Sequence, residues 1–156
     1  MHLSLNNNIS YSFETPISYH VIVKNINKIS ASNFITIDTK NTLNTKNLTL
    51  STCNSAIINA ELNTEELTVN SSNSSSVSVS GTAHHQDVTL ENSSNYNAQS
   101  LNSNTAQVKA SNSSRANINA KSFIRYALSN SSVLTYTGNP KINGSKKNSS
   151  KTTHKN

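Results

Sequence analysis

The chain has 156 residues, enough for a single domain, and Ser, Thr and Asn account for 72 of them. Only 33% of the residues are apolar, against roughly 45–50% in ordinary globular chains, so the composition excludes a thick layered core. The formal charge is +6, and no segment approaches the roughly 20 apolar residues of a transmembrane helix. A disordered chain or a thin repetitive fold remains, and the many Val, Ile and Thr residues favour the second because they are strand formers.

The N-terminal part, residues 1–28, is expected to form lead-in strands and the first coil of such a fold. The stretch from Tyr19 to Ile29 supports this expectation, because it is apolar and resembles a strand. The first residues, MHLSLNNNISYSF, lack the apolar core of a secretory signal peptide, so this sequence shows no export signal of its own.

Residues 29–142 carry an internal repeat centred on asparagine. Words such as SSNSS and ASNSS recur at spacings of 21, 19, 19, 20 and 18 residues. The asparagines at the centre of these words, here called the hubs, are Asn33, Asn54, Asn73, Asn92, Asn112 and Asn130. Apolar or small residues stand two and four residues before most hubs and four and six residues after them, as at Val108, Ala110, Ala116 and Ile118. Four such columns in register are too many to arise from composition alone.

The even spacing of these columns predicts β-strands, because alternate side chains of a strand share one face. Each unit is therefore interpreted as a strand, an asparagine-centred corner, a second strand and a connector. The connectors carry Leu62, Leu101 and Phe123, with Gly81 at the equivalent short turn. One unit cannot bury its inward face, whereas stacked units can. We therefore predict an all-β fold, a parallel β-helix or β-solenoid of about 19 residues per coil.

The asparagine at each hub has a structural explanation. A corner between two strands needs left-handed backbone dihedrals, which Gly accepts most easily and Asn next. Stacked amide side chains can also hydrogen-bond from coil to coil, and the flanking Ser hydroxyls can bond free backbone groups. The alternative is a row of Asn and Ser side chains that binds a ligand. The predicted structural ladder consists of Asn54, Asn73, Asn92, Asn112 and Asn130.

The C-terminal end departs from this pattern. Asn148 fits the spacing, but Lys146 and Thr152 replace the apolar flanks, so its rung is expected to be degenerate or absent. Residues 143–156 are predicted to form a basic, disordered tail, because five lysines lie in the last sixteen residues. This segment has no aromatic residue for base stacking, so we predict no nucleic-acid binding and at most weak attraction to anionic surfaces.

Residues with catalytic or metal-binding potential are few. The acidic residues of the connector 61–66 are interpreted as solvated. The word AHHQD offers His84, His85 and Asp87, but adjacent histidines of an extended chain point to opposite sides, and the matching connectors supply no further ligand. Cys53 is the single cysteine and is interpreted as structural. We therefore predict no enzyme activity, no metal and no cofactor.

Two segments of the chain resemble a known family. FIRYALSNSSVLTYTGNPKI, residues 123–142, is similar to the closing signature of the putative auto-transporter adhesin, head GIN domain family, and Tyr136, Gly138, Asn139 and Pro140 match its Y-x-G-N-P motif. PISYHVIVKNINKISAS, residues 16–32, is similar to the opening of that family. The chain has Asn where the family quartet starts with Gly, but both residues accept the same dihedrals. Members usually carry an exported N-terminus and another half-domain before the matching point.

This resemblance implies a right-handed β-helix and an extracytoplasmic location, in the periplasm, outer membrane or at the cell surface. It supplies no catalytic residue. We therefore expect an adhesin-like domain that contacts a glycan or a protein surface. The alternatives are a carbohydrate-surface or ice-binding solenoid and, less favoured, a polysaccharide hydrolase on the same scaffold. The first coil should expose an unpaired strand edge, so self-association through the N-terminal end of the solenoid is also expected.

Overall fold

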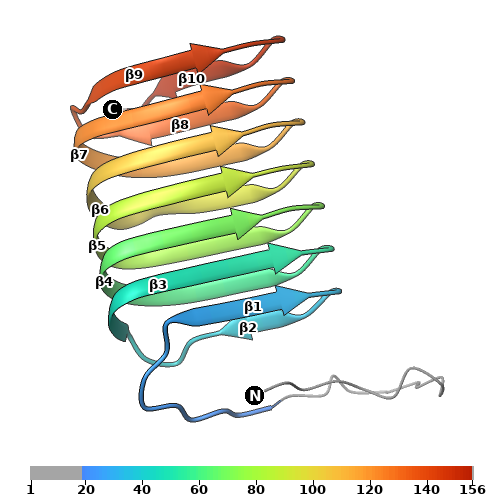
Figure 1. The fold of residues 1–156 in the computed structure, drawn as a ribbon, viewed down its shortest axis with the longest axis vertical. Helices are drawn as coiled ribbons and strands as arrows, with labels where there is room; N and C mark the ends of the chain where they lie inside the picture. Colours follow the sequence, from blue (N-terminus) through green and yellow to red (C-terminus); the bar gives the residue numbers. More distant parts are fainter. Residues whose placement is uncertain (1–18, 156) are drawn as a thin grey trace.

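The structure is a computed structural model that describes residues 19–155 of the chain. Within these residues ten strands form one sheet, all pairs are parallel, and no helix is present that could cross a membrane (Figure 1). The strands are β1 (Lys28–Ser32), β2 (Thr36–Asp38), β3 (Leu43–Cys53), β4 (Ile57–Ser71), β5 (Ser76–Leu90), β6 (Asn95–Ala110), β7 (Arg115–Leu128), β8 (Val133–Thr137), β9 (Lys141–Lys146) and β10 (Lys151–His154).

The sheet winds into a solenoid. The strand segments that lead to each corner lie in front in Figure 1 and the segments that follow it lie behind, while the chain rises from coil to coil, so the winding is right-handed. We call these two sides the front face and the rear face. Long strands such as β4 run from one corner to the next and bend at the opposite edge of the rod.

The core is a narrow stack between the two faces. Burial alternates along β4 and β5, as the even spacing of the repeat predicts. Leu50, Val69, Val88 and Val108 pair in register from coil to coil and have no exposed surface. Each coil thus covers the apolar face of the one before it, which removes from water a surface that a single coil would expose. The predicted all-β solenoid of about 19 residues per coil is confirmed.

The prediction of a disordered C-terminal tail is wrong. Residues 141–146 form β9 on β7, residues 151–154 form β10 on β8, and the Asn148 corner between them is present. The coil is held by backbone hydrogen bonds to the preceding strands, which do not require apolar flanks. Lys146 follows Leu128 in an inward column but is exposed, because it lies on the open side of this coil.

The expected lead-in strands are also wrong for the residues that can be judged. Residues 19–27 contain no strand, and residues 1–18 lie outside the described part. Val21 and Val23 are about half exposed, and only Ile26 of this segment packs against the core. The run from His20 to Val23 does not alternate apolar with polar residues, so it has no single face to bury.

The predicted equivalence of Phe123 with Leu62 and Leu101 is wrong. Leu62 and Leu101 are buried at the bend and pair through Gly81, as predicted. Phe123, however, pairs with Thr105, four residues after Leu101, because the coil that contains it is shorter and the strands shift in register. The half-buried Phe123 therefore lies beyond the bend.

Candidate functional site

The hub asparagines form a continuous ladder along one edge of the rod. Seven hubs have φ between 51° and 59°. From the second hub onward, each Nδ2 donates a hydrogen bond to Oδ1 of the hub one coil earlier, over distances of 2.7–3.1 Å. This ladder, here called the Asn ridge, comprises Asn33, Asn54, Asn73, Asn92, Asn112, Asn130 and Asn148. The amides satisfy one another, so the ridge is a structural element that leaves only part of each amide free for a ligand.

Sequence reasoning missed the second residue of each corner. The residue after each hub is also left-handed, with φ between 59° and 65°; it is Phe34 in the first corner and serine in the other six. Its N–H donates to the hub carbonyl of the next coil, as Ser113 does to Asn130 at 2.8 Å. The corner is therefore a pair of left-handed residues. The hub side chain donates to the preceding coil, and the backbone N–H of the second residue donates to the following coil.

A third corner residue is buried. Ser114 Oγ donates to the Ser111 carbonyl at 2.7 Å, and Ser75, Ser94 and Ser132 make the same bond in their coils. These side chains have no exposed surface, so an unpaired hydroxyl there would be costly. The Asn and the two Ser residues that follow it in the SNSS word thus have three different structural roles. Sequence reasoning identified the role of the Asn but gave the Ser hydroxyls only a general one.

The family-signature residues lie at the bend between β8 and β9. The rings of Tyr136 and His154 are stacked with centroids 5.0 Å apart, and His154 Nε2 contacts the Gly138 carbonyl at 2.7 Å. Gly138 has φ +89°, and a Cβ there would lie 2.4 Å from the Ala120 carbonyl oxygen. Asn139 is exposed and Pro140 is half-buried. These residues shape a tight bend against the preceding coil, which is a structural task.

A regular polar row runs along the rear face. Its members pair from coil to coil and project outward between inward-facing core residues. We call it the rear row; it comprises Asp38, Asn59, Ser78, Asn97, Asn117, Thr135 and Thr153. At one end Asn59 Nδ2 donates to Asp38 Oδ1 at 2.8 Å. From Asn59 onward the row is uncharged and offers amides and hydroxyls at the spacing of the coils.

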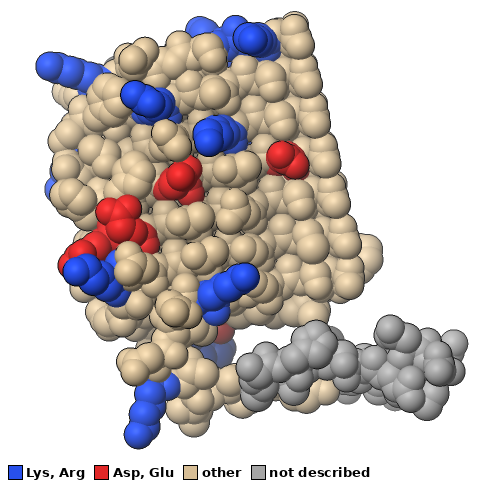
Figure 2. Space-filling model, viewed as in Figure 1, with Lys and Arg blue, Asp and Glu red and all other residues tan. Residues whose placement is uncertain are grey.

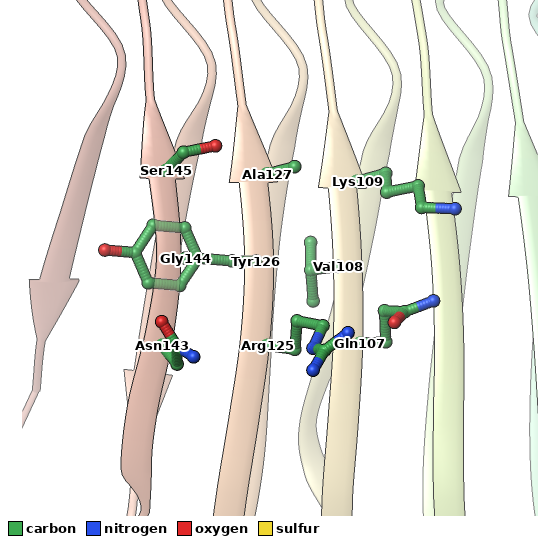
Figure 3. Close-up of a pocket in the computed structure, with 9 residues that line it drawn as sticks. All are labelled: Gln107, Val108, Lys109, Arg125, Tyr126, Ala127, Asn143, Gly144 and Ser145. Atoms are coloured by element: carbon green, nitrogen blue, oxygen red, sulfur yellow. The ribbon is translucent and has the colours of Figure 1, made fainter.

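A shallow groove marks the front face near the last coils (Figure 3). It is lined by Gln107, Val108, Lys109, Arg125, Tyr126, Ala127, Asn143, Gly144 and Ser145, from β6, β7 and β9. Arg125 extends toward Gln107, whereas the Tyr126 ring lies over Gly144 (Figure 3). A Cβ at Gly144 would come within 2.7 Å of Tyr126 Cγ, so the glycine makes room for that ring. This front groove contains two cations, two amide side chains and no carboxylate.

The residues singled out for metal or catalytic potential are dispersed. His84 is exposed, whereas His85 Nδ1 is 2.8 Å from Thr105 Oγ1 of the next coil. Glu65 pairs with Lys46 at 3.6 Å, and both side chains are largely exposed, so the pair contributes little. Cys53 is a half-buried free thiol. Within residues 19–155 no three His, Cys, Asp or Glu side chains gather as a metal site.

A buried polar network inside the core was not foreseen. Tyr96 Oη donates to Gln86 Oε1 at 3.0 Å, and Gln86 Nε2 donates to Ser103 Oγ at 2.7 Å. Ser103 Oγ in turn donates to the Asn119 carbonyl at 2.6 Å. Burial raises the pKa of the Tyr96 phenol well above its usual range. The network lies where β6 and β7 shift in register, and the change in hub spacing from 20 to 18 residues was the available signal.

Comparisons with known proteins identify the family of this chain. The model of the family "Putative auto-transporter adhesin, head GIN domain" matches residues 2–140. The chain belongs to this family. No curated protein matches the chain.

Two solved structures resemble this head GIN domain in fold. A putative adhesin from Parabacteroides merdae superposes with a TM-score of 0.81 at 17% identity, covering 83% of this chain and 55% of the other. A putative adhesin from Bacteroides fragilis superposes with a TM-score of 0.72 at 23% identity, covering 82% of this chain and 59% of the other. The chain therefore spans a little over half the length of these proteins, and the likeness concerns the fold alone.

Proposed function

We propose that this head GIN domain is a non-enzymatic binding module of adhesin type that contacts glycans or protein surfaces outside the cytoplasm. The rear row carries this proposal. It presents donors and acceptors on a flat face at the regular spacing of parallel strands, roughly 4.8 Å. A flat, repetitive surface suits an extended partner that makes many modest contacts.

Two shallow hollows on the faces of the rod favour contact with an extended partner rather than a small substrate. The hollow on the rear face is lined by strand side chains such as Asn59, Ser78 and Asn97. The front groove is also shallow, because its floor is the outer surface of the sheet. Family membership and the description of both structural relatives as putative adhesins support the adhesin role and the extracytoplasmic location.

The proposal is tested by blocking the rear row. The purified domain is applied to arrays of neutral and acidic glycans and to immobilised extracellular proteins. The double variant Ser78→Tyr, Asn97→Tyr places two bulky neutral side chains in the row and should reduce binding to whichever surface the wild type recognises. The control Thr49→Tyr, Thr68→Tyr adds the same bulk to outward positions of the front face, away from the front groove, and should bind like the wild type. Binding to no surface, or equal loss in both variants, would refute the proposal.

A further inference from the structure

The charge of the domain is distributed unevenly along the rod. From Tyr19 to Glu91 there are four basic and six acidic residues, whereas the chain after Glu91 has nine basic residues and no acidic one. Because the coils stack in sequence order, this division becomes a division in space. Figure 2 shows it on one face, where only basic side chains lie above the acidic ones, toward the last coils.

The basic residues surround the last coils. Lys141 and Lys146 belong to β9, Lys147 adjoins the corner, and Lys151 begins β10 on the opposite face. We call this region the basic end; it comprises Lys109, Arg115, Lys121, Arg125, Lys141, Lys146, Lys147, Lys151 and Lys155. The one salt bridge among the described residues joins Lys46 to Glu65, so none of these nine cations is in an ion pair there.

Such an arrangement repels itself and attracts anions. Nine cations gathered in one half of the rod raise the potential over both faces and favour encounter with a negatively charged partner, while the nearest carboxylate, Asp87, lies at the border and accepts from Gln107 at 3.5 Å. The front groove lies inside this region, with Arg125 and Lys109 beside the amides of Gln107 and Asn143. On the rear face Arg115 and Lys151 stand in one column, next to the rear-row residues Asn117 and Thr153.

We propose that the basic end binds a polyanionic glycan, a polysaccharide that carries sulfate, phosphate or carboxylate groups, and that the front groove receives one of its acidic sugars. This inference rests on the proposed binding function and names the ligand class. The cations would contact the anionic groups, while the neighbouring amides and hydroxyls would bond sugar hydroxyls. Both types of group are needed for a charged carbohydrate, and both are present in the groove.

Other polyanions fit this surface less well. Single-stranded nucleic acids are held by exposed aromatic rings on which bases stack. Here Tyr126 covers Gly144 and Tyr136 stacks on His154, so both rings are already engaged. Anionic membranes favour surfaces that add an apolar wedge to their basic residues. In this region Ile142 is the one large apolar residue that is exposed, with 42% of its surface accessible.

The test uses dextran sulfate, alginate and neutral dextran as probes, with binding measured by titration calorimetry at several salt concentrations. The wild type should bind both acidic polymers, more weakly as salt rises, and should not bind neutral dextran. The variant Lys109→Gln, Arg125→Gln should bind about tenfold more weakly, a loss of about 1.4 kcal/mol. The matched control Lys28→Gln, Lys40→Gln removes the same charge from the other half and should bind within about twofold of the wild type.

Several outcomes would overturn the proposal. Equal loss in the groove variant and the control would show that only net charge matters. Tighter binding of a poly-dT oligonucleotide or of phosphatidylglycerol vesicles would assign the surface to nucleic acid or membrane. If the groove variant melts early by circular dichroism, Lys147→Gln, Lys151→Gln replaces it with the same expectation. Binding to neutral glycans but not to acidic ones would leave the adhesin proposal standing and refute this one.

Discussion

At the scale of single residues, the corner decides the fold. Each corner places two consecutive L-residues in the left-handed region, a conformation that costs free energy for side chains with a branched Cβ. Asn and Ser are tolerated because their short polar side chains form local or inter-coil hydrogen bonds there. Such a left-handed pair recurs at seven corners, and its strain is offset by the ridge bonds and by the packing of the coils.

The first prediction concerns Asn112 and Ser113. Replacing Ser113 by Gly should change stability little, because Gly adopts positive φ freely. Replacing Asn112 by Gly should cost less than its replacement by Val, because Gly accepts the backbone conformation and loses only the two exposed ridge bonds. Replacing either by Val should cost about 1–3 kcal/mol, because a β-branched residue resists φ near 54° or 64°. Urea unfolding followed by circular dichroism measures the difference. Equal stability of the Gly and Val variants at both positions would contradict the two-residue corner.

The second prediction uses the buried phenol of Tyr96. Its folded-state pKa is raised by burial, so below about pH 10 both states hold the proton and the group has no effect. Above that pH the unfolded chain ionises while the folded core retains the proton, so the free energy of unfolding should fall by about 1.4 kcal/mol per pH unit. Urea titrations between about pH 9 and 12 should show stability falling more steeply with pH in the wild type than in Tyr96→Phe, and the difference should grow above about pH 10. Identical slopes in the two proteins would contradict it.

At the level of the strands, backbone pairing with the preceding coil decides where a strand forms more than the local composition of the sequence does. The columns around Asn112 foretold strands, because their alternation is a local property of the sequence. The same reasoning failed at residues 143–156, where the flanks are polar but β9 and β10 form on the open edges of β7 and β8. It also failed to foresee the Gln86 network, which depends on a register shift between coils. The ladder of the candidate site was readable from spacing, whereas the front groove was not, because it joins side chains from three coils.

The third prediction follows from that correction. Deleting residues 143–156 should uncover Leu128 and Leu134 and expose edges of β7 and β8. The loss of more than about 2 kcal/mol should lower the melting temperature by about 5 °C or more. The control Lys147→Gln, Lys151→Gln keeps the strands and removes two charges, so it should melt near the wild type. A deletion variant as stable as the wild type would instead support the prediction of a disordered tail.

At the scale of the whole molecule, the two ends of the rod differ in kind. One end carries exposed apolar side chains, with Ile22 at 98% and Phe34 at 82%, beside the short strands β1 and β2. The other end carries the lysines of the last coil. Open strand edges and exposed apolar side chains favour association, whereas like charges oppose it.

The fourth prediction is weak self-association of the chain through its N-terminal end. Sedimentation velocity should show a larger average mass as concentration rises. The variant Ile22→Ser, Phe34→Ser should reduce this trend, and Phe34→Ser gives the first corner the serine that the other corners already have. Ile142→Ser, at the opposite end, serves as the control and should behave like the wild type. A wild-type chain that remains monomeric at high concentration would refute the idea.

The Asn ridge has a consequence for length. Every interior corner shares one amide bond and one backbone bond with the corner of the coil on either side, so all the joints are alike. A whole repeat could therefore be gained or lost without altering the joint at either neighbour, and each such event would lengthen or shorten the rod by roughly 4.8 Å. The number of repeats then sets the distance between the charged end and the apolar end of the rod. It leaves the character of both ends unchanged.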